Sequence, residues 1–175
     1  MKKLIIVMFV ILLPLFFTPI SAVAGNELKV KDLAPAVKLK THEGKDFDLS
    51  NRKGQWTVLY FYPKAGTPGC TKQACAFRDS LDKIKEAGAE VFGVSSDSVD
   101  AQAKFHKEHR LNFILLADHD SKIIEAYGVK VPVIGVAKRW TFIIDPELKI
   151  RAIIKGADPV VDSETMAQKI IELKK

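Results

Sequence analysis

The chain has 175 residues, a formal net charge of +6 and 47% hydrophobic residues. Its basic residues are spread along the sequence, and many have acidic neighbours, so the pattern favours a solvated surface over a nucleic-acid-binding patch. Without its first 24 residues the chain keeps 151, which fits one domain with a sizeable core, and its two cysteines are too few for a disulfide framework.

The first residues have the features of a secretory signal peptide. Lys2 and Lys3 precede an apolar stretch from Leu4 to Phe17, and Ala22-Val23-Ala24 has the small-x-small pattern of a cleavage site. The apolar stretch is shorter than the about twenty residues that a membrane-spanning helix needs. We therefore expect a signal peptide at residues 1–24, cleavage after Ala24 and export, with a retained N-terminal anchor as the alternative.

Strand and helix patterns alternate along the rest of the chain. Two short segments flank Glu43-Gly44 as a hairpin, and TVLYFY at 57–62 is typical of a central strand buried on both faces. A helix is predicted over 70–87. The later patterns are a strand at 90–95, a helix at 99–109, a strand at 113–117, a helix at 121–127, an antiparallel pair at 140–144 and 150–154, and a last helix capped by Ser163. This order predicts an α/β fold of thioredoxin-like architecture, with a mixed β-sheet flanked by helices and an N-terminal β-hairpin.

The spacing of the two cysteines restricts how they can pair. Cys70 and Cys75 both fall in the helix predicted over 70–87. Five helical residues separate two Cα atoms by roughly 8–9 Å, whereas a disulfide needs about 4.4–6.8 Å. A disulfide and an intact helix therefore exclude each other. Either the helix is broken at rest, or the pair bonds only when the first helical turns unwind.

The surroundings predicted for the two cysteines are unequal. Cys70 follows Pro68-Gly69 at a helix N-terminus, where the N–H groups and the dipole favour a thiolate, and Cys75 lies deeper among apolar residues that favour a neutral thiol. The Thr67 hydroxyl can donate to and accept from a group bound over that thiolate, and Pro63 can shield the thiolate from water. Taken singly, Thr67 is a helix cap and Pro63 ends a strand; together with Cys70 they indicate a reactive-thiol site.

The segment Pro63-x-x-x-Thr67-x-x-Cys70 resembles the active-site pattern of peroxiredoxins. TPGCTKQAC, followed by Phe77-Arg78-Asp79, resembles the peroxiredoxin Q group, also called bacterioferritin comigratory protein, in which a resolving cysteine often lies five residues after the peroxidatic one. The segment RWTFIID, which begins at Arg139, resembles the family segment that carries the active-site arginine. The resemblance runs from about Leu33 to the carboxyl end. It departs at Ala65-Gly66, where an acidic residue is common, and in the signal peptide, since many relatives are cytosolic.

The resemblance implies a thiol-dependent peroxidase in one domain, residues 25–175, that reduces hydrogen peroxide and organic hydroperoxides. Cys70 is then the peroxidatic cysteine, which becomes a sulfenic acid, and Cys75 is the resolving cysteine of an intramolecular disulfide. The same resemblance assigns peroxide binding and catalysis to a small group of residues, with Gln73 as a supporting candidate: Pro63, Thr67, Gly69, Cys70 and Arg139.

The resemblance also implies a thioredoxin-like dithiol reductant, no cofactor, no metal and a monomer. We expect no nucleic-acid partner and no stable membrane association after signal cleavage. The signal peptide predicts a periplasmic location, where a cytosolic thioredoxin is out of reach. Arg78 and Asp79 are expected to form a structural pair, and Tyr60 and Trp140 to pack in the core or the pocket wall.

Two other classes of function stay open. An exported thiol–disulfide oxidoreductase would place two cysteines at a helix start, although that class uses two intervening residues and this chain has four. A copper-binding chaperone of thioredoxin fold would use paired thiols and a histidine, and His106 and His109 have a helical ligand spacing. A purely structural exported protein does not explain the unequal cysteine surroundings.

Overall fold

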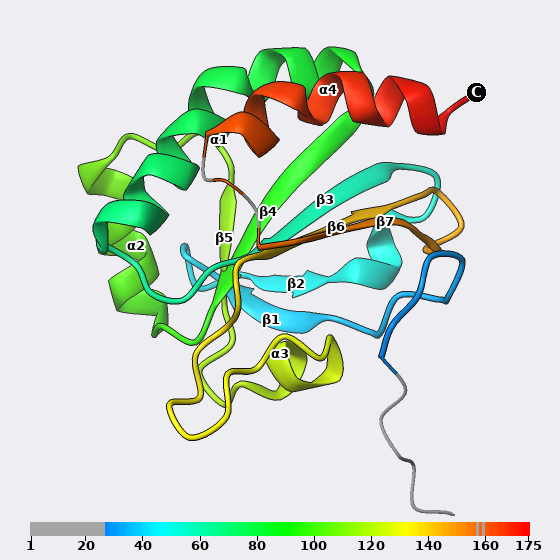
Figure 1. Ribbon diagram of the computed structural model, residues 1–175. Helices are drawn as coiled ribbons and strands as arrows, with labels where there is room; N and C mark the ends of the chain where they lie inside the picture. Colours follow the sequence, from blue (N-terminus) through cyan, green and yellow to red (C-terminus); the bar gives the residue numbers. More distant parts are fainter. Residues whose placement is uncertain (1–26, 157, 159) are drawn as a thin grey trace, which may run out of the picture.

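A computed structural model describes residues 27–156, 158 and 160–175, so the predicted signal peptide at 1–24 and the cleavage after Ala24 lie outside the described residues. In the described part, seven strands form one mixed sheet in the order β2-β1-β5-β4-β3-β6-β7 (Figure 1). The strands are β1 Lys38–Thr41, β2 Asp46–Asp48, β3 Trp56–Phe61, β4 Ala89–Ser95, β5 Ile114–Ala117, β6 Trp140–Ile144 and β7 Ile150–Lys155. The predicted mixed sheet and its N-terminal hairpin, β1–β2, are confirmed.

Helices cover both faces of this sheet. They are α1 Pro68–Glu86, α2 Val99–Glu108, α3 Lys122–Ala126 and α4 Val161–Leu173, with a 3₁₀ turn at Leu49–Arg52. Side chains of α1, α2 and α4 pack on one face, and α3 packs on the other, which gives the layered arrangement seen in Figure 1. Among the described residues, no helix has the length and apolar character needed to cross a membrane.

Strand β3 positions the functional end of the molecule. All six of its residues are buried, as the apolar run predicted, and it pairs in parallel with β4 and antiparallel with β6. Helix α1 follows the carboxyl end of β3, while β6 begins at that same end because the register joins Tyr60 to Thr141. The antiparallel strand therefore brings Arg139, the residue just before β6, to the N-terminus of α1.

The Tyr60 side chain crosses its neighbour on β4. Tyr60 pairs with Gly93 in the parallel register, and a Cβ at Gly93 would lie 2.6 Å from both the Tyr60 hydroxyl and Cζ. The Tyr60 ring then stacks on Phe77 of α1, with 4.7 Å between ring centroids. Because Gly93 has no side chain, the Tyr60 ring can lie over β4 and form part of the surface on which α1 packs.

The start of the last helix differs from the prediction. We expected Ser163 to cap it, but α4 begins at Val161 and the residue in the capping position is Val160. The turn forms earlier because the carboxylate of Asp158 accepts a hydrogen bond from the Val160 N–H at 3.0 Å. Ser163 is buried inside the helix, and its hydroxyl donates to the Val160 carbonyl at 2.8 Å.

Candidate active site

A tight turn leads from β3 into α1. The Thr67 hydroxyl donates to the Lys64 carbonyl at 3.0 Å, and the Thr71 N–H donates to the Thr67 carbonyl at 2.8 Å. Thr67 occupies the capping position of α1, but in the described part of the chain its side chain makes no capping hydrogen bond. The first N–H groups of a helix have no partner within the helix, so this turn presents them around Cys70, the third residue of α1.

Arg139 lies against Cys70. Its Nη2 is 3.5 Å from the Cys70 sulfur, and its Nη1 donates to Gln73 Oε1 at 2.6 Å. Cys70 is only 1% exposed. A Cβ at Gly69 would lie 3.2 Å from Arg139 Nη2, so a side chain there would press on the guanidinium. Because an arginine is always charged, this arrangement places a fixed positive charge beside the Cys70 sulfur.

Gln73 joins the site from one turn further along α1. Its side chain is completely buried, and its Nε2 has no hydrogen-bond partner among the described residues. Thr141 Oγ1 is also buried without a partner in this part of the chain. Sequence analysis missed Thr141, although alternation along β6 would have found it, since residues 139, 141 and 143 share one face of the strand.

The segment before Thr67 is held by hydrogen bonds to Gln102 and Asp97. Pro63 is half-buried next to Tyr62, whose hydroxyl donates to Gln102 Oε1. Burial raises the pKa of Tyr62 well above its ordinary value, so the hydroxyl stays protonated and donates. The Ala65 N–H donates to Asp97 Oδ2 at 2.7 Å. Sequence analysis did not identify Gln102 or Asp97, because they lie more than thirty residues away along the chain.

Cys75 lies on the same helix but outside this site. It is half-buried and lines a surface cavity of about 410 Å³ together with Lys72, Ala76, Asp79, Ser80 and Val160. Helix α1 runs unbroken through both cysteines, which are free thiols in this part of the chain. The structure therefore describes the state with an intact helix, and the predicted Cys70–Cys75 disulfide is not part of it.

The histidines that suggested a metal site have other contacts. His106 stacks on His42 with 3.8 Å between ring centroids, and the His109 ring packs edge-on against Phe105. No group of three or more His, Cys, Asp or Glu side chains among the described residues is placed to hold a metal ion. Arg78 and Asp79 form the expected pair, with Arg78 Nε 2.8 Å from Asp79 Oδ1.

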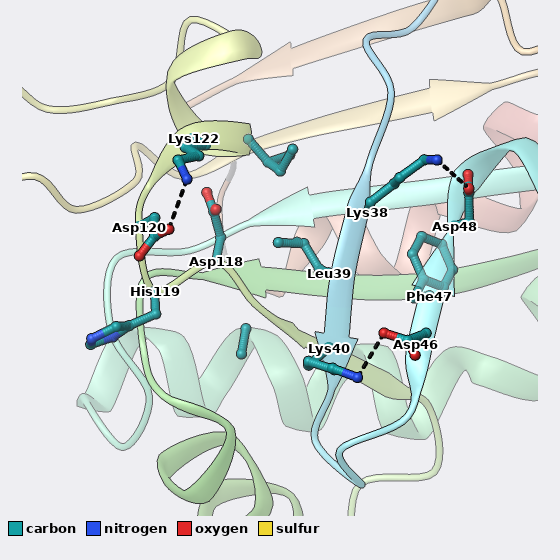
Figure 2. Close-up of a pocket in the computed structure, with 12 residues that line it drawn as sticks. Lys38, Leu39, Lys40, Asp46, Phe47, Asp48, Asp118, His119, Asp120 and Lys122 are labelled. Atoms are coloured by element: carbon teal, nitrogen blue, oxygen red, sulfur yellow. Dashed lines mark hydrogen bonds and ion pairs between the residues drawn. The ribbon is translucent and has the colours of Figure 1, made fainter.

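A larger cavity, of about 530 Å³, lies apart from the cysteines between the β1–β2 hairpin and α3 (Figure 2). Leu39, Phe47 and Ile123 are among its apolar lining residues. Charged side chains at its rim pair with one another: Lys38 with Asp48, Lys40 with Asp46 and Lys122 with Asp120, at 3.3, 2.7 and 3.0 Å. None of the predicted site residues lines it, so the candidate active site is the Cys70–Arg139 region.

Comparisons with known proteins point to one family. The AhpC/TSA family matches residues 30–153. Peroxiredoxin Bcp of Escherichia coli is 40% identical over 131 residues, which are 71% of this chain and 84% of that protein. The chloroplastic peroxiredoxin Q of Populus jackii is 48% identical over 112 residues, which are 63% of this chain but only 53% of that protein.

A solved structure agrees with these relatives. The peroxidoxin BcpB of Mycobacterium tuberculosis is similar with a TM-score of 0.77 and 33% identity, covering 85% of this chain and 99% of the other. The two alternatives, a thiol–disulfide oxidoreductase and a copper-binding chaperone, gain no support from these relatives. The chain therefore belongs to the AhpC/TSA family, among the peroxiredoxins of the Q and Bcp group.

Proposed function

We propose that the protein is a thiol peroxidase that reduces hydrogen peroxide and organic hydroperoxides, with Cys70 as the reacting group. The observation that carries this proposal is the contact of Arg139 with both the Cys70 sulfur, at 3.5 Å, and Gln73, at 2.6 Å. A buried thiol beneath a fixed guanidinium at a helix N-terminus has the surroundings of a reactive thiolate. Family membership supports the same reaction class.

In the first step, the Cys70 thiolate attacks the terminal oxygen of the peroxide. The O–O bond breaks, Cys70 becomes a sulfenic acid, and water or an alcohol leaves after gaining a proton. The Thr67 hydroxyl and the Cys70 N–H, both at the turn, would hold the two oxygens. Arg139 stabilises the negative charge that develops on them, and Gln73 holds Arg139 in position.

In the second step, the Cys75 sulfur attacks the Cys70 sulfur, a disulfide forms and water leaves. An intact α1 keeps the two Cα atoms roughly 8–9 Å apart, so the first turns of α1 must unwind for this step. A dithiol protein reductant, which we take to be thioredoxin-like, then restores both thiols by exchange.

We further propose that residues 25–175 act as one exported domain, released by cleavage after Ala24, and that the protein works as a monomer. Export would require a reductant in the same compartment. Mass spectrometry of the protein recovered from fractionated cells tests this, because a chain that begins at Gly25 in the periplasmic fraction supports export. A chain that keeps Met1 in the cytosol excludes it.

The decisive experiment is stopped-flow peroxide consumption by the reduced protein, with Cys70→Ser and Cys75→Ser beside it. We expect a fast wild-type reaction, no reaction for Cys70→Ser, and a single turnover for Cys75→Ser that stops at a sulfenic acid trapped by dimedone. A wild-type rate no faster than that of a free thiol would exclude the peroxidase, and disulfide exchange would become the next activity to test.

A further inference from the structure

A continuous chain of hydrogen bonds runs beneath the turn that precedes Cys70. Asp97 Oδ2 accepts from the Ala65 N–H and from the Ser95 hydroxyl, each at 2.7 Å. Ser95 Oγ accepts from Gln102 Nε2 at 2.8 Å, and Gln102 Oε1 accepts from the Tyr62 hydroxyl. Both ends of the segment 62–65 are therefore tied to one polar network, which is supplied by the end of β4, by the loop that follows it and by α2.

The polarity of this network is fixed. Ser95 and Gln102 are completely buried, and Gln102 Nε2 also donates to the Leu116 carbonyl at 3.1 Å, which sets the orientation of its amide group. The hydrogen bonds therefore all point toward the Asp97 carboxylate, the only charged group in the chain of contacts described. Hydrogen bonds to a charged acceptor are about twice as strong as neutral ones.

The network is mechanically connected to Cys70. The Lys64 carbonyl accepts from Thr67, and the Thr67 carbonyl accepts from Thr71, which is the residue after Cys70. Unwinding the first turn of α1 breaks the Thr71–Thr67 bond and frees the turn at 64–67 to move. The Ala65–Asp97 bond opposes that movement, because it ties the middle of the segment to the loop after β4.

We propose that Asp97 is a positioning residue that, through the Ala65 N–H, holds the turn before Cys70 in its peroxide-reactive arrangement and thereby limits the rate at which α1 unwinds to let Cys75 reach Cys70. This inference rests on the proposed function. Asp97 thus sets the balance between two fates of the Cys70 sulfenic acid. One fate is disulfide formation with Cys75, and the other is further oxidation by a second peroxide to a sulfinic acid.

The test compares Asp97→Ala and Asp97→Asn with the wild type. Loss of a charged hydrogen bond should speed Cys70–Cys75 disulfide formation about tenfold in Asp97→Ala. The fraction of Cys70 overoxidised at high peroxide, measured by mass spectrometry, should fall in the same variant. Asp97→Asn keeps an oxygen acceptor, so both readouts should lie between those of the wild type and of Asp97→Ala. Tyr62→Phe breaks the other end of the network and should shift both readouts in the same direction as Asp97→Ala.

Ser98→Ala is the matched control. It removes the cap of α2, where Ser98 Oγ accepts from the Ala101 N–H at 3.3 Å, one residue from Asp97 but without contact to Ala65. Equal changes in Ser98→Ala and Asp97→Ala would overturn the proposal, because they would reflect a general loss of stability. An unchanged disulfide rate in both Asp97 variants would overturn it as well.

Two further readouts do not depend on peroxidase activity. Disulfide formation driven by the thiol oxidant diamide, and amide hydrogen exchange of residues 64–71 in the reduced protein, both report opening of the turn. Asp97→Ala should accelerate both, even if the wild type fails to react with peroxide. If the wild type is inert to peroxide but Asp97→Ala still accelerates opening, the proposed peroxidase activity alone is refuted. If the wild type reacts with peroxide but Asp97→Ala does not change opening, the role of Asp97 alone is refuted.

Discussion

Cys70 and Cys75 are five residues apart on α1, and the protein surrounds them in different ways. Cys70 faces the sheet, is 1% exposed and lies against Arg139, which Gln73 holds in turn. Cys75 is half-buried at a surface cavity, near Arg78, whose guanidinium pairs with Asp79. Cys70 thus lies in a polar, enclosed site, whereas Cys75 lies in an open, largely apolar one.

The difference shows how a short helical spacing can give two thiols different surroundings. About 1.4 turns of helix rotate the second sulfur away from the guanidinium and toward solvent. The intact helix keeps the two sulfurs apart, so the disulfide proposed above would require the first turns of α1 to unwind. Four experiments test this comparison, in order of decreasing expected effect.

Removing Arg139 should affect Cys70 alone. Arg139→Met keeps an unbranched apolar side chain but removes the charge and both donors, so the second-order rate constant with peroxide should fall about 10²–10³-fold. Stopped-flow kinetics measures it, with Arg151→Met as the control, because Arg151 contacts Asp145 and the Leu173 carbonyl and neither cysteine. A similar loss in both variants would contradict the assigned role.

Bulky thiol reagents should distinguish the two sulfurs. A polymer-linked maleimide needs an accessible sulfur, so Cys75 should be labelled about tenfold or more faster than Cys70 in the folded, reduced protein, because Cys70 requires local opening. Peptide mapping after timed quenching gives both rates, and the difference should largely disappear in denaturant. Equal labelling of the folded protein would mean that Cys70 is not enclosed in solution.

Replacing Gln73 should have a smaller effect than replacing Arg139. Gln73→Leu removes the acceptor for Arg139 Nη1, so the guanidinium gains freedom and the peroxide rate should fall about tenfold. The variant also removes a buried Nε2 that has no partner among the described residues, so the free energy of unfolding should hold or rise. Denaturant titration beside the kinetics separates these effects; a slow variant that is also unstable would indicate a packing role only.

The stacked pair of His42 and His106 lies away from both cysteines. Protonation of this pair should change the stability of the fold but not the difference between Cys70 and Cys75. Burial lowers the pKa of each ring below its ordinary value of 6.5, and His42 further lowers the pKa of His106. Below about pH 6.5 the unfolded chain therefore binds more protons than the folded one, so the free energy of unfolding should fall as the pH falls.

Denaturant titrations between pH 7.5 and 5.5 measure this dependence. His106→Phe keeps an aromatic ring on His42 but cannot be protonated, so it should flatten the curve. His119→Gln, at an exposed position, is the control and should leave the curve unchanged. An unaltered slope in His106→Phe would show that the pair does not cause the pH dependence.

Much of this arrangement was predictable because its signals are local. The buried strand at 57–62, the hairpin at Glu43-Gly44 and the helix through both cysteines depend on patterns within a few residues, and the structure has each of them within one or two positions. The start of α4 was not predicted correctly. The Asp158 carboxylate and Ser163 are both suitable for a helix start, and only the three-dimensional path shows that Asp158 begins the turn.

The site shows the same limit. Residues 63–75 could be placed from their spacing. The proximity of Arg139 to Cys70 was predicted only from a family resemblance, and the antiparallel register of β3 and β6 explains it. Asp97 and Gln102 reach the segment before Cys70 through sheet order and side-chain direction. Neither property is encoded in a short stretch of sequence, so these contacts required the structure.

The crossing of Tyr60 over Gly93 also constrains how this sequence can diverge. A methyl group at position 93 would occupy the space of the phenol ring, so the position accepts a side chain only if residue 60 becomes smaller. A smaller residue 60 would in turn leave Phe77 without the ring on which it stacks. Position 93 can therefore gain a side chain only together with a change at position 60, and a single substitution of Gly93 should be selected against in descendants of this protein.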